Sequence, residues 1–438
     1  MILFLITFLS TILSVYHILS SVKHKNIIYK YNNAQKSITI IIPCYNEAPI
    51  IKNTIDGLQN LDYKNFNVIF VNDGSTDETF NILNNELELA KINTNYVKLD
   101  NSIKSISKSV KYSHITVIDK YNTGKANSLN KAISLSDSEL ILTMDGDCVL
   151  KSDTLKIMSM TFTDKNVIAS GGAIHIMQVF KLQKKPSLLI LLQSLDYIKG
   201  FYVYKSSLAY NNALAIISGA FGVFKRTVLE EIGCFNSGLG EDIDLTLRIQ
   251  QYAYQNNKKI IYNDNAICYT ECPEKLRDLS AQRIRWQKGF IDSVIKNRKF
   301  IFRNLIKSNV CFFIFFDAIT INSIAIIALF INLYLISIKL VTNGNLDLLY
   351  YILLLLIFNY IYSIIALYKA KKYVSSIKFK NYIFIILIDM LLFRFMYIYF
   401  FIYGSISYCL KFRSWNKIKR TNNKYILRKK IQSGGYNG

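Results

Sequence analysis

Two carboxylates separated by one glycine stand about a third of the way along the chain. Asp145 and Asp147 directly follow an apolar run that ends at Met144. Leaving two carboxylates uncompensated at the end of a buried strand is costly, and a hard divalent cation such as Mg2+ or Mn2+ satisfies both. The spacing therefore predicts a metal site, and the plainer alternative is a tight turn.

A second group of chemically useful residues lies further along the chain. Gln282, Arg285 and Trp286 are spaced i, i+3 and i+4, so on a helix an amide, a guanidinium and an indole share one face. Such a face can hold a diphosphate by forked hydrogen bonds and offer a flat ring to a sugar. The alternative is a basic helix beside a membrane with an interfacial tryptophan.

Turn-forming residues follow two more apolar runs. The first run leads into Pro43-Cys44-Tyr45-Asn46-Glu47, and the second into Asp73-Gly74-Ser75. Asp73 at a strand end can accept hydrogen bonds from a ribose or a base, and Gly74 permits the tight turn. The alternative is that the second segment is only a turn and that Asp77 caps the helix after it.

Strands and helices alternate around these residues. The pattern predicts strands at residues 37–42, 67–71, 115–119 and 139–144, with helices at 48–58, 76–90 and 124–135 between them. This alternation is typical of a Rossmann-like, doubly wound α/β domain with a largely parallel sheet, whose ligands bind at the carboxyl ends of the strands. Neither a dinucleotide fingerprint nor a P-loop motif is present in the sequence.

Apolar segments outside this domain predict membrane helices. Residues 1–22 read as an uncleaved anchor, and 311–335 and 348–367 are each long enough to span a bilayer. The short segment 341–347 between the last two lacks Lys and Arg and suits an outside loop. The stretch 382–410 is too long for one perpendicular span and too short for two, so a break near Asp389 and Arg394 stays open. Asp317, Asp389 and Arg394 are expected to face either the interior of a helix bundle or an aqueous path, or else to lie near the membrane–water interface.

The net charge of +23 follows the membrane segments. Five lysines fall within residues 369–380 and nine Lys or Arg within 411–430, with no acidic residue in either segment. This distribution predicts cytoplasmic loops and contact with anionic lipid, and it argues against a nucleic-acid partner. The seven cysteines show no zinc-site spacing, which predicts free thiols.

Several motifs, in order along the chain, resemble those of one family. They are PCYNE (43–47), NDGSTDET (72–79), NTGKAN (122–127), MDGD (144–147), ISGAFG (217–222), GEDID (240–244) and QRIRW (282–286). Together they resemble the processive family 2 glycosyltransferases of GT-A fold, which include cellulose or β-glucan, poly-N-acetylglucosamine and hyaluronan synthases. The chain departs at Gly240, where many polymer-forming members carry Thr, and this weakens any assignment of the product.

The resemblance implies a role for each motif residue. Asp242, with Glu241 beside it, is implied as the catalytic base, and Asp145 and Asp147 as ligands of Mg2+ or Mn2+. Asp244 is expected to be a surface or supporting acid of the helix. The donor nucleotide-sugar is expected to contact Pro43, Tyr45, Glu47, Asp73, Lys125, Asp145, Gln282 and Arg285. The acceptor is expected to contact Ser218, Gly219 and Trp286.

The domains expected from these patterns run in a simple order. They are an anchor at 1–22, a GT-A catalytic domain at 36–275, amphipathic interface helices at 276–308, membrane helices at 309–410 and a basic tail of cytoplasmic type at 411–438. A count of four spans places this tail outside, whereas its nine basic residues argue for the inside. The protein is thus expected in the plasma membrane as a multi-pass protein with its catalytic domain in the cytoplasm.

The expected function is polymerisation. The resemblance implies a membrane-embedded inverting glycosyltransferase that builds and exports a β-linked polysaccharide from UDP-glucose or UDP-N-acetylglucosamine. Its partners are then the UDP-sugar, the growing glycan and the lipid bilayer, with room for an accessory membrane subunit. One alternative is a non-processive enzyme that adds a sugar to a polyprenyl phosphate or diacylglycerol. Another is an inactive membrane protein that binds nucleotide-sugars.

Overall fold

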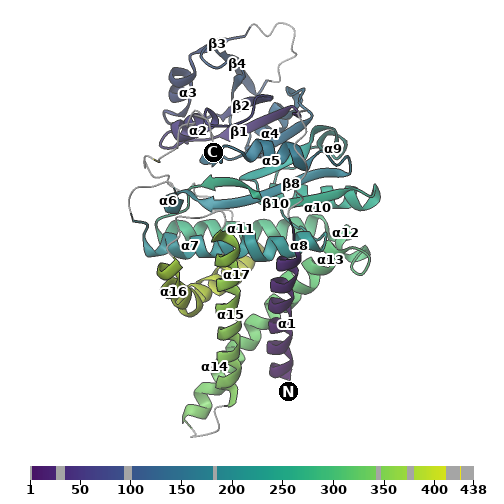
Figure 1. Ribbon diagram of the computed structural model, residues 1–438, viewed down its shortest axis with the longest axis vertical. Coiled ribbons are helices and arrows are strands. Elements are labelled where there is room, and N and C mark those ends of the chain that lie inside the picture. The colour runs from purple at the N-terminus through teal and green to yellow at the C-terminus, as the bar shows by residue number, and fades with distance from the viewer. Residues whose placement is uncertain are drawn as a thin grey trace, which may run out of the picture. The chain divides into compact units, whose positions relative to one another are not determined.

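The computed structural model describes residues 2–25, 35–92, 101–180, 185–341, 347–371, 379–410 and Tyr425 (Figure 1). The chain divides into two compact units. One, here called the sheet unit, comprises residues 26–190, 216–282 and 415–438, and the other, the helical unit, comprises 1–25, 191–215 and 283–414. The expected outside loop at 341–347, except for Val341 and Asp347, and the expected tail, except for Tyr425, lie outside the described residues.

The sheet unit is built on a ten-stranded sheet with the order β3-β4-β5-β2-β1-β6-β9-β8-β10-β7. Its strands are β1 (Ile38–Cys44), β2 (Phe66–Asp73), β3 (Leu89–Lys91), β4 (Ile103–Ser109), β5 (Ile115–Lys120), β6 (Leu140–Met144), β7 (Cys148–Leu150), β8 (Val167–Ile176), β9 (Phe221–Lys225) and β10 (Lys259–Thr270). The four strands predicted from the sequence are β1, β2, β5 and β6, and they form the centre of the sheet.

These four central strands are parallel, in the order β5-β2-β1-β6. Their residues are almost all buried, as expected for strands covered on both faces. Because they run in one direction, the loops after β1, β2, β5 and β6 begin at the same edge of the sheet. Asp73, Lys125 and Asp145 therefore lie at the edge formed by the carboxyl ends of these strands, as predicted.

The prediction of a largely parallel sheet is wrong for the whole sheet, which is mixed. β8 pairs with β10 in parallel, but β3 with β4, β4 with β5, β6 with β9, β8 with β9, and β7 with β10 pair antiparallel. Two strands that follow each other in the chain run antiparallel when the connection between them begins and ends at the same end of the strands. A parallel pair instead needs a crossover connection from one end of the strands to the other. The alternating pattern used for the prediction ended at Met144.

The helices of the sheet unit are α2 (Ile51–Leu58), α3 (Thr79–Leu87), α4 (Lys125–Ser134), α5 (Thr154–Thr161), α6 (Met177–Phe180), α9 (Arg226–Glu231) and α10 (Glu241–Gln255). The first three of these are the helices predicted from the sequence. α3 ends before the predicted Ala90, because Glu88 adopts a left-handed conformation (φ 51°) and β3 begins at Leu89. The seven cysteines, all within the described residues, form no disulfide, as predicted.

Helices make up the other unit. α1 (Ile2–Lys23), η1 (Gly200–Tyr204), α8 (Lys205–Tyr210), α12 (Arg298–Arg303), α13 (Asn309–Phe312), η2 (Phe313–Ile321), α14 (Asn322–Val341), α15 (Asp347–Lys371), α16 (Phe379–Ile388), η3 (Asp389–Phe393) and α17 (Arg394–Cys409) belong to it. The division between the units falls within α7 (Leu188–Lys199) and α11 (Leu276–Lys296).

Among the described residues, two helices are long and apolar enough to cross a membrane, Asn309–Ile327 and Tyr382–Cys409. The second contains the π-helical turn η3 and no break at Asp389. Asp389 is buried and pairs with Lys199, while Asp317 accepts a hydrogen bond from Tyr204 (3.0 Å). Both carboxylates therefore face the interior of the helical unit.

Candidate functional site

Asp73 ends β2, and its carboxylate organises the loop that follows β5. The register of the parallel pair places Lys120 opposite Asp73, and Lys120 donates a hydrogen bond to Asp73 Oδ1. The backbone N–H groups of Thr123 and Gly124 donate to Oδ1 and Oδ2, each at 3.0 Å. Of the roughly four acceptor positions of a carboxylate, three are thus taken by the protein itself, which leaves about one for a ligand.

Lys120 was missed by the sequence analysis. Its side chain is fully buried, and it also donates to the carbonyl oxygen of Tyr121 (2.8 Å) and to Thr123 Oγ1 (2.6 Å). All three protons of the ammonium group are therefore used within the protein. The pairing holds the start of the 120–124 loop in place, and Lys125 directly follows this loop.

We expect Lys120→Met to destabilise the sheet unit. The substitution leaves the Asp73 carboxylate, which is 4% exposed, without its counter-charge. Removal of one partner of a buried ion pair typically costs about 3–5 kcal/mol of unfolding free energy. Denaturant unfolding followed by circular dichroism measures the effect, with Lys52→Met as the control because its pair with Glu86 lies at the surface. Equal stability of the two variants would contradict the role assigned to the buried pair.

The turn after β2 depends on two residues with left-handed backbone. Gly74 has φ +66°, and a Cβ there would lie 2.7 Å from the backbone nitrogen of Asn122, so only glycine fits. Asn46 has φ 54°, and its side-chain oxygen accepts the N–H of Thr76 (2.7 Å). Asp77 accepts the N–H of Thr79 (3.0 Å), the first residue of α3, although the N-cap position itself is Glu78 and not Asp77 as the plainer interpretation predicted.

The loop after β1 packs against the glycine between the two central aspartates. The oxygen of Pro43 and the Cγ atom of Glu47 lie 3.5 and 3.2 Å from the position of a Cβ on Gly146. Thr54 donates to the Gly146 carbonyl oxygen (2.7 Å). Glu47 is buried and Tyr45 is half-buried. The close packing explains why the residue between Asp145 and Asp147 must be small.

Lys125, at the start of α4, joins two predicted parts of the site. Its Nζ lies 2.7 Å from Asp145 Oδ1 and 3.2 Å from Glu241 Oε1. Burial opposes the charged form, but the carboxylates of Asp145, Glu241 and Asp242 outweigh it and raise the pKa of Lys125. Lys125 therefore stays protonated at neutral pH and supplies a fixed positive charge at this edge of the sheet.

Asp242 lies in the first turn of α10, next to Gly219. Its Oδ2 accepts the N–H of Gly219 (3.0 Å), and its Oδ1 accepts the N–H of Ile243 (2.9 Å). A Cβ on Gly219 would lie 3.1 Å from Lys125 Nζ and 3.4 Å from Asp242 Oδ2, so the glycine permits this close approach. Ser218 is half-buried beside it.

The pKa of Asp242 is raised. Burial is the largest cause and the charge of Glu241 adds to it, whereas Lys125 and the two backbone N–H groups act in the opposite direction. The carboxylate is thus held in a fixed orientation and has a higher affinity for a proton than an ordinary aspartate. Both properties suit a group that accepts a proton from a hydroxyl.

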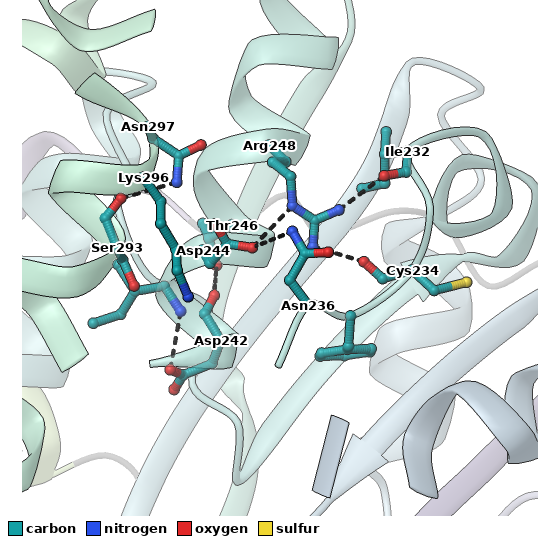
Figure 2. Close-up of polar contacts among 12 residues, drawn as sticks. Ile232, Cys234, Asn236, Asp242, Asp244, Thr246, Arg248, Ser293, Lys296 and Asn297 are labelled. Carbon is teal, nitrogen blue, oxygen red and sulfur yellow. Dashed lines mark hydrogen bonds and ion pairs between the residues drawn. The ribbon is translucent and has the colours of Figure 1, made fainter. Parts of the chain in front are cut away.

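Asp244, two residues further along α10, has a different environment (Figure 2). It is 4% exposed and accepts hydrogen bonds from Asn236 and from Arg248 Nε, both at 3.0 Å. Arg248 also donates to the carbonyl oxygens of Ile232 (2.8 Å) and Cys234 (2.6 Å). Of the two expectations for Asp244, the surface acid is wrong and the supporting acid fits, because the buried carboxylate anchors the loop that leads to α10.

Asp147 points into the sheet, where it is 3% exposed. Its contacts include Thr270 Oγ1 and Cys148 Sγ, both at 3.5 Å. Asp145 is only partly covered, with a third of its side chain exposed. Among the described residues, no group of three or more His, Cys, Asp or Glu side chains is arranged as a complete metal site.

Gln282, Arg285 and Trp286 all lie on α11, as the predicted helix requires. Gln282 is 9% exposed, and its Oε1 has no hydrogen-bond partner among the described residues. Arg285 is half-buried, and Trp286 is 37% exposed. The partly exposed indole is accessible to a ligand, and the buried amide oxygen has a hydrogen-bond capacity that the described residues leave unused.

Comparison with known proteins gives a consistent result. The model of glycosyl transferase family 2 matches residues 39–233, and that of glycosyl transferase family group 2 matches residues 140–410. The chain is similar to poly-beta-1,6-N-acetyl-D-glucosamine synthase of Staphylococcus epidermidis, with 26% identity over 270 residues, or 61% of this chain and 58% of that protein. The corresponding synthase of Staphylococcus aureus strain COL is 27% identical over 256 residues, or 58% and 54%. The chain therefore spans a little over half the length of these curated relatives.

A solved structure has a similar fold. It is the mannosyltransferase PcManGT from Pyrobaculum calidifontis in complex with GDP-Man and Mn2+. The TM-score is 0.59 and the sequence identity 18%, and the match covers 93% of this chain and 97% of that one. This likeness concerns the GT-A-like mixed sheet and its helices.

Proposed function

The chain belongs to glycosyl transferase family 2, and from this premise we propose that it is an inverting glycosyltransferase that extends a β-linked polysaccharide. The observation that carries the proposal is the cluster of Lys125, Asp145, Glu241 and Asp242 at one edge of the sheet. It combines a fixed positive charge with an oriented carboxylate of raised pKa. These are the two requirements of a displacement that releases a diphosphate and takes up a proton.

The donor is a nucleotide-diphosphate sugar. The two poly-N-acetylglucosamine synthases support UDP-N-acetylglucosamine over UDP-glucose. Asp73 is proposed to use its remaining acceptor position for the nucleoside, together with Pro43, Tyr45 and Glu47 of the loop after β1. Lys125, Gln282 and Arg285 are proposed to bind the diphosphate, because their ammonium, amide and guanidinium groups donate hydrogen bonds to phosphate oxygens.

Asp145 and Asp147 are proposed to hold Mg2+ or Mn2+. Both offer the hard oxygen atoms that these ions prefer, and a third of the Asp145 side chain is exposed, so an ion can reach it. Two protein carboxylates fit an ion that completes its coordination with phosphate oxygens and water, as Mg2+ commonly does. When bound, the ion supplies positive charge opposite the leaving diphosphate.

Asp242 is proposed to be the general base. The acceptor hydroxyl attacks the anomeric carbon of the donor, the bond from that carbon to the diphosphate breaks, and the hydroxyl proton passes to Asp242. One displacement converts an α-linked donor into a β-linked product. The N–H groups of Gly219 and Ile243 orient the carboxylate, and Glu241 keeps its proton affinity high.

Trp286 is proposed to hold the acceptor sugar, with Ser218 and Gly219 next to the base. The CH face of a sugar packs well on an aromatic ring, and 37% of Trp286 is exposed. An aromatic platform that keeps the chain end bound through several additions favours polymer formation over single transfer. The Trp286 platform is thus the feature that favours a polymer-forming enzyme over one that transfers a single sugar to a lipid.

The protein is further proposed to lie in the plasma membrane, with its catalytic domain in the cytoplasm and its product exported. The two long apolar helices Asn309–Ile327 and Tyr382–Cys409 support this. Tyr425, in the basic tail, is buried and donates a hydrogen bond to Glu271 of the sheet unit. This contact supports a tail on the same side of the membrane as the catalytic domain, as the positive charge of the tail also favours.

The product tests the proposed function. Detergent-solubilised protein is incubated with UDP-N-acetylglucosamine, UDP-glucose and GDP-mannose in separate reactions, and products are treated with linkage-specific hydrolases. We expect polymer of high molecular weight from UDP-N-acetylglucosamine. Only organic-extractable lipid carrying one or two sugars would establish the non-processive alternative, and no turnover with any donor would support an inactive binding protein.

We expect Glu241→Gln to shift the pH dependence of activity. Asp242 acts as a base only when deprotonated, so activity falls as the pH drops through its pKa. Removal of the negative charge of Glu241 lowers that pKa, and the acid limb of kcat/KM moves to lower pH. Glu139→Gln, at a surface ion pair with Lys36, serves as the control. An acid limb that stayed in place or moved to higher pH would refute the coupling between the two acids.

A further inference from the structure

Arg283 occupies a position of the α11 motif to which the proposed function assigns no role. Its side chain is 8% exposed, although arginine is rarely buried without a specific partner. Its Nη2 atom donates to Asp196 Oδ2 of α7 at 3.2 Å. The Tyr397 hydroxyl of α17 donates to the same oxygen. Arg283 is therefore tied to two other helices of the helical unit.

The guanidinium group of Arg283 is also surrounded by aromatic rings. Its central carbon lies 4.2 Å from the ring centroid of Trp286, 5.5 Å from that of Tyr397 and 5.6 Å from that of Tyr197. Tryptophan is the best aromatic partner for a cation, and the attraction grows when water is excluded. The shortest of the three contacts is the one with Trp286, three residues further along the same helix.

The stacking restricts the indole. A planar guanidinium group covers part of Trp286, and its own direction is fixed by the carboxylate of Asp196. The 37% of Trp286 that remains exposed is then the part a sugar can contact. A ring with a fixed orientation loses little rotational freedom when it binds a sugar, so each addition cycle begins from a platform already in place.

We infer that Arg283 is a positioning residue that, together with Asp196 and Tyr397, holds Trp286 as a rigid acceptor platform and thereby sets the length of the polysaccharide. The inference rests on the proposed function, because it assumes that Trp286 binds the acceptor. Arg283 itself contacts neither donor nor acceptor in this arrangement. Its loss should impair retention of the chain end more than the transfer of each sugar.

The experiment uses the intrinsic fluorescence of Trp286. The chain has two tryptophans, so Trp415→Phe leaves Trp286 as the only one. In this background, Arg283→Met removes the charge and the planar fork but keeps an unbranched stem, and Arg283→Lys keeps only the charge. Tyr397→Phe removes only the hydroxyl that binds Asp196 and is the mildest change. Arg277→Met, at an exposed arginine of the same helix, is the matched control.

Four quantities are measured for each variant. They are acrylamide quenching of the tryptophan, the length of the polymer, the affinity for an oligosaccharide acceptor, and the rate of UDP release at saturating donor. For Arg283→Met we expect stronger quenching, shorter chains and an affinity for a β-1,6-linked N-acetylglucosamine pentasaccharide weakened by about tenfold. The rate of UDP release of Arg283→Met should change far less than these quantities. Arg283→Lys and Tyr397→Phe should show smaller effects in the same direction. Arg277→Met should show no effect.

The outcomes separate this inference from the proposed function. If Trp286→Ala does not shorten the product, the acceptor role of Trp286 fails and the inference fails with it. If Trp286→Ala shortens the product but the Arg283 and Tyr397 variants keep wild-type quenching and chain length, the positioning role alone is overturned. If Arg283→Met does not fold, Arg283→Lys and Tyr397→Phe decide by the same criteria.

Discussion

Asp242→Asn is expected to abolish polymer synthesis while UDP-sugar binding is nearly retained. The amide has the size of the carboxylate but cannot accept the proton of the acceptor hydroxyl at neutral pH. Loss of a positioned general base typically lowers the rate by about 10²–10⁴-fold. The measurement is UDP release under saturating donor, with donor affinity determined separately by calorimetry.

The control for this substitution is Asp56→Asn, the same chemical change at an exposed position of α2. It should leave both turnover and donor affinity unchanged. If Asp242→Asn retained more than a small part of the wild-type rate, Asp242 could not be the base. If it lost donor binding and turnover together, its role would be to hold the donor site.

Removal of divalent metal is expected to stop the reaction. The diphosphate leaves with more negative charge than Lys125 and Arg285 can offset alone, and a metal ion typically contributes several kcal/mol to such a step, or at least about a hundredfold in rate. Activity should disappear with EDTA and return with Mg2+ or Mn2+. Asp147→Asn should reduce both turnover and the metal-dependent part of UDP affinity.

Metal titration against UDP affinity distinguishes this role from a structural one. In the wild type, UDP affinity should rise with Mn2+ concentration, and in Asp147→Asn it should depend little on Mn2+. Thermal unfolding in EDTA should show that the fold is retained without metal. Synthesis at full rate in the presence of the chelator would refute the metal-dependent mechanism.

Local patterns were sufficient to predict the central part of the catalytic domain. Strands β1, β2, β5 and β6 and helices α2 to α4 lie within a few residues of their predicted positions. Their apolar runs and turn residues are consecutive in the sequence, and parallel βα units bring the loops to one edge. The placement of Asp73, Lys125 and Asp145 at that edge followed from this regularity alone.

The other strands depended on contacts between distant parts of the chain. β3 and β7 are short and lie at the two borders of the sheet, β4 pairs antiparallel with both of its neighbours, and β9 enters the sheet only after the long segment between residues 177 and 220. Strand pairing of this kind depends on which partner edge is free, which no local pattern contains. The sheet is therefore mixed, although its centre is parallel.

By itself, the sequence determined which residues carry the candidate chemistry, through motif types and helical spacing: Asp145, Asp147, Asp242 and Trp286. Only the tertiary structure decided their partners. Lys120 was a plain lysine until the register of β2 and β5 placed it against Asp73, and Arg283 was an unassigned position until α7 and α17 supplied Asp196 and Tyr397. The physical reason is that pKa values, orientation and burial depend on neighbours that are close in space but far apart in the chain.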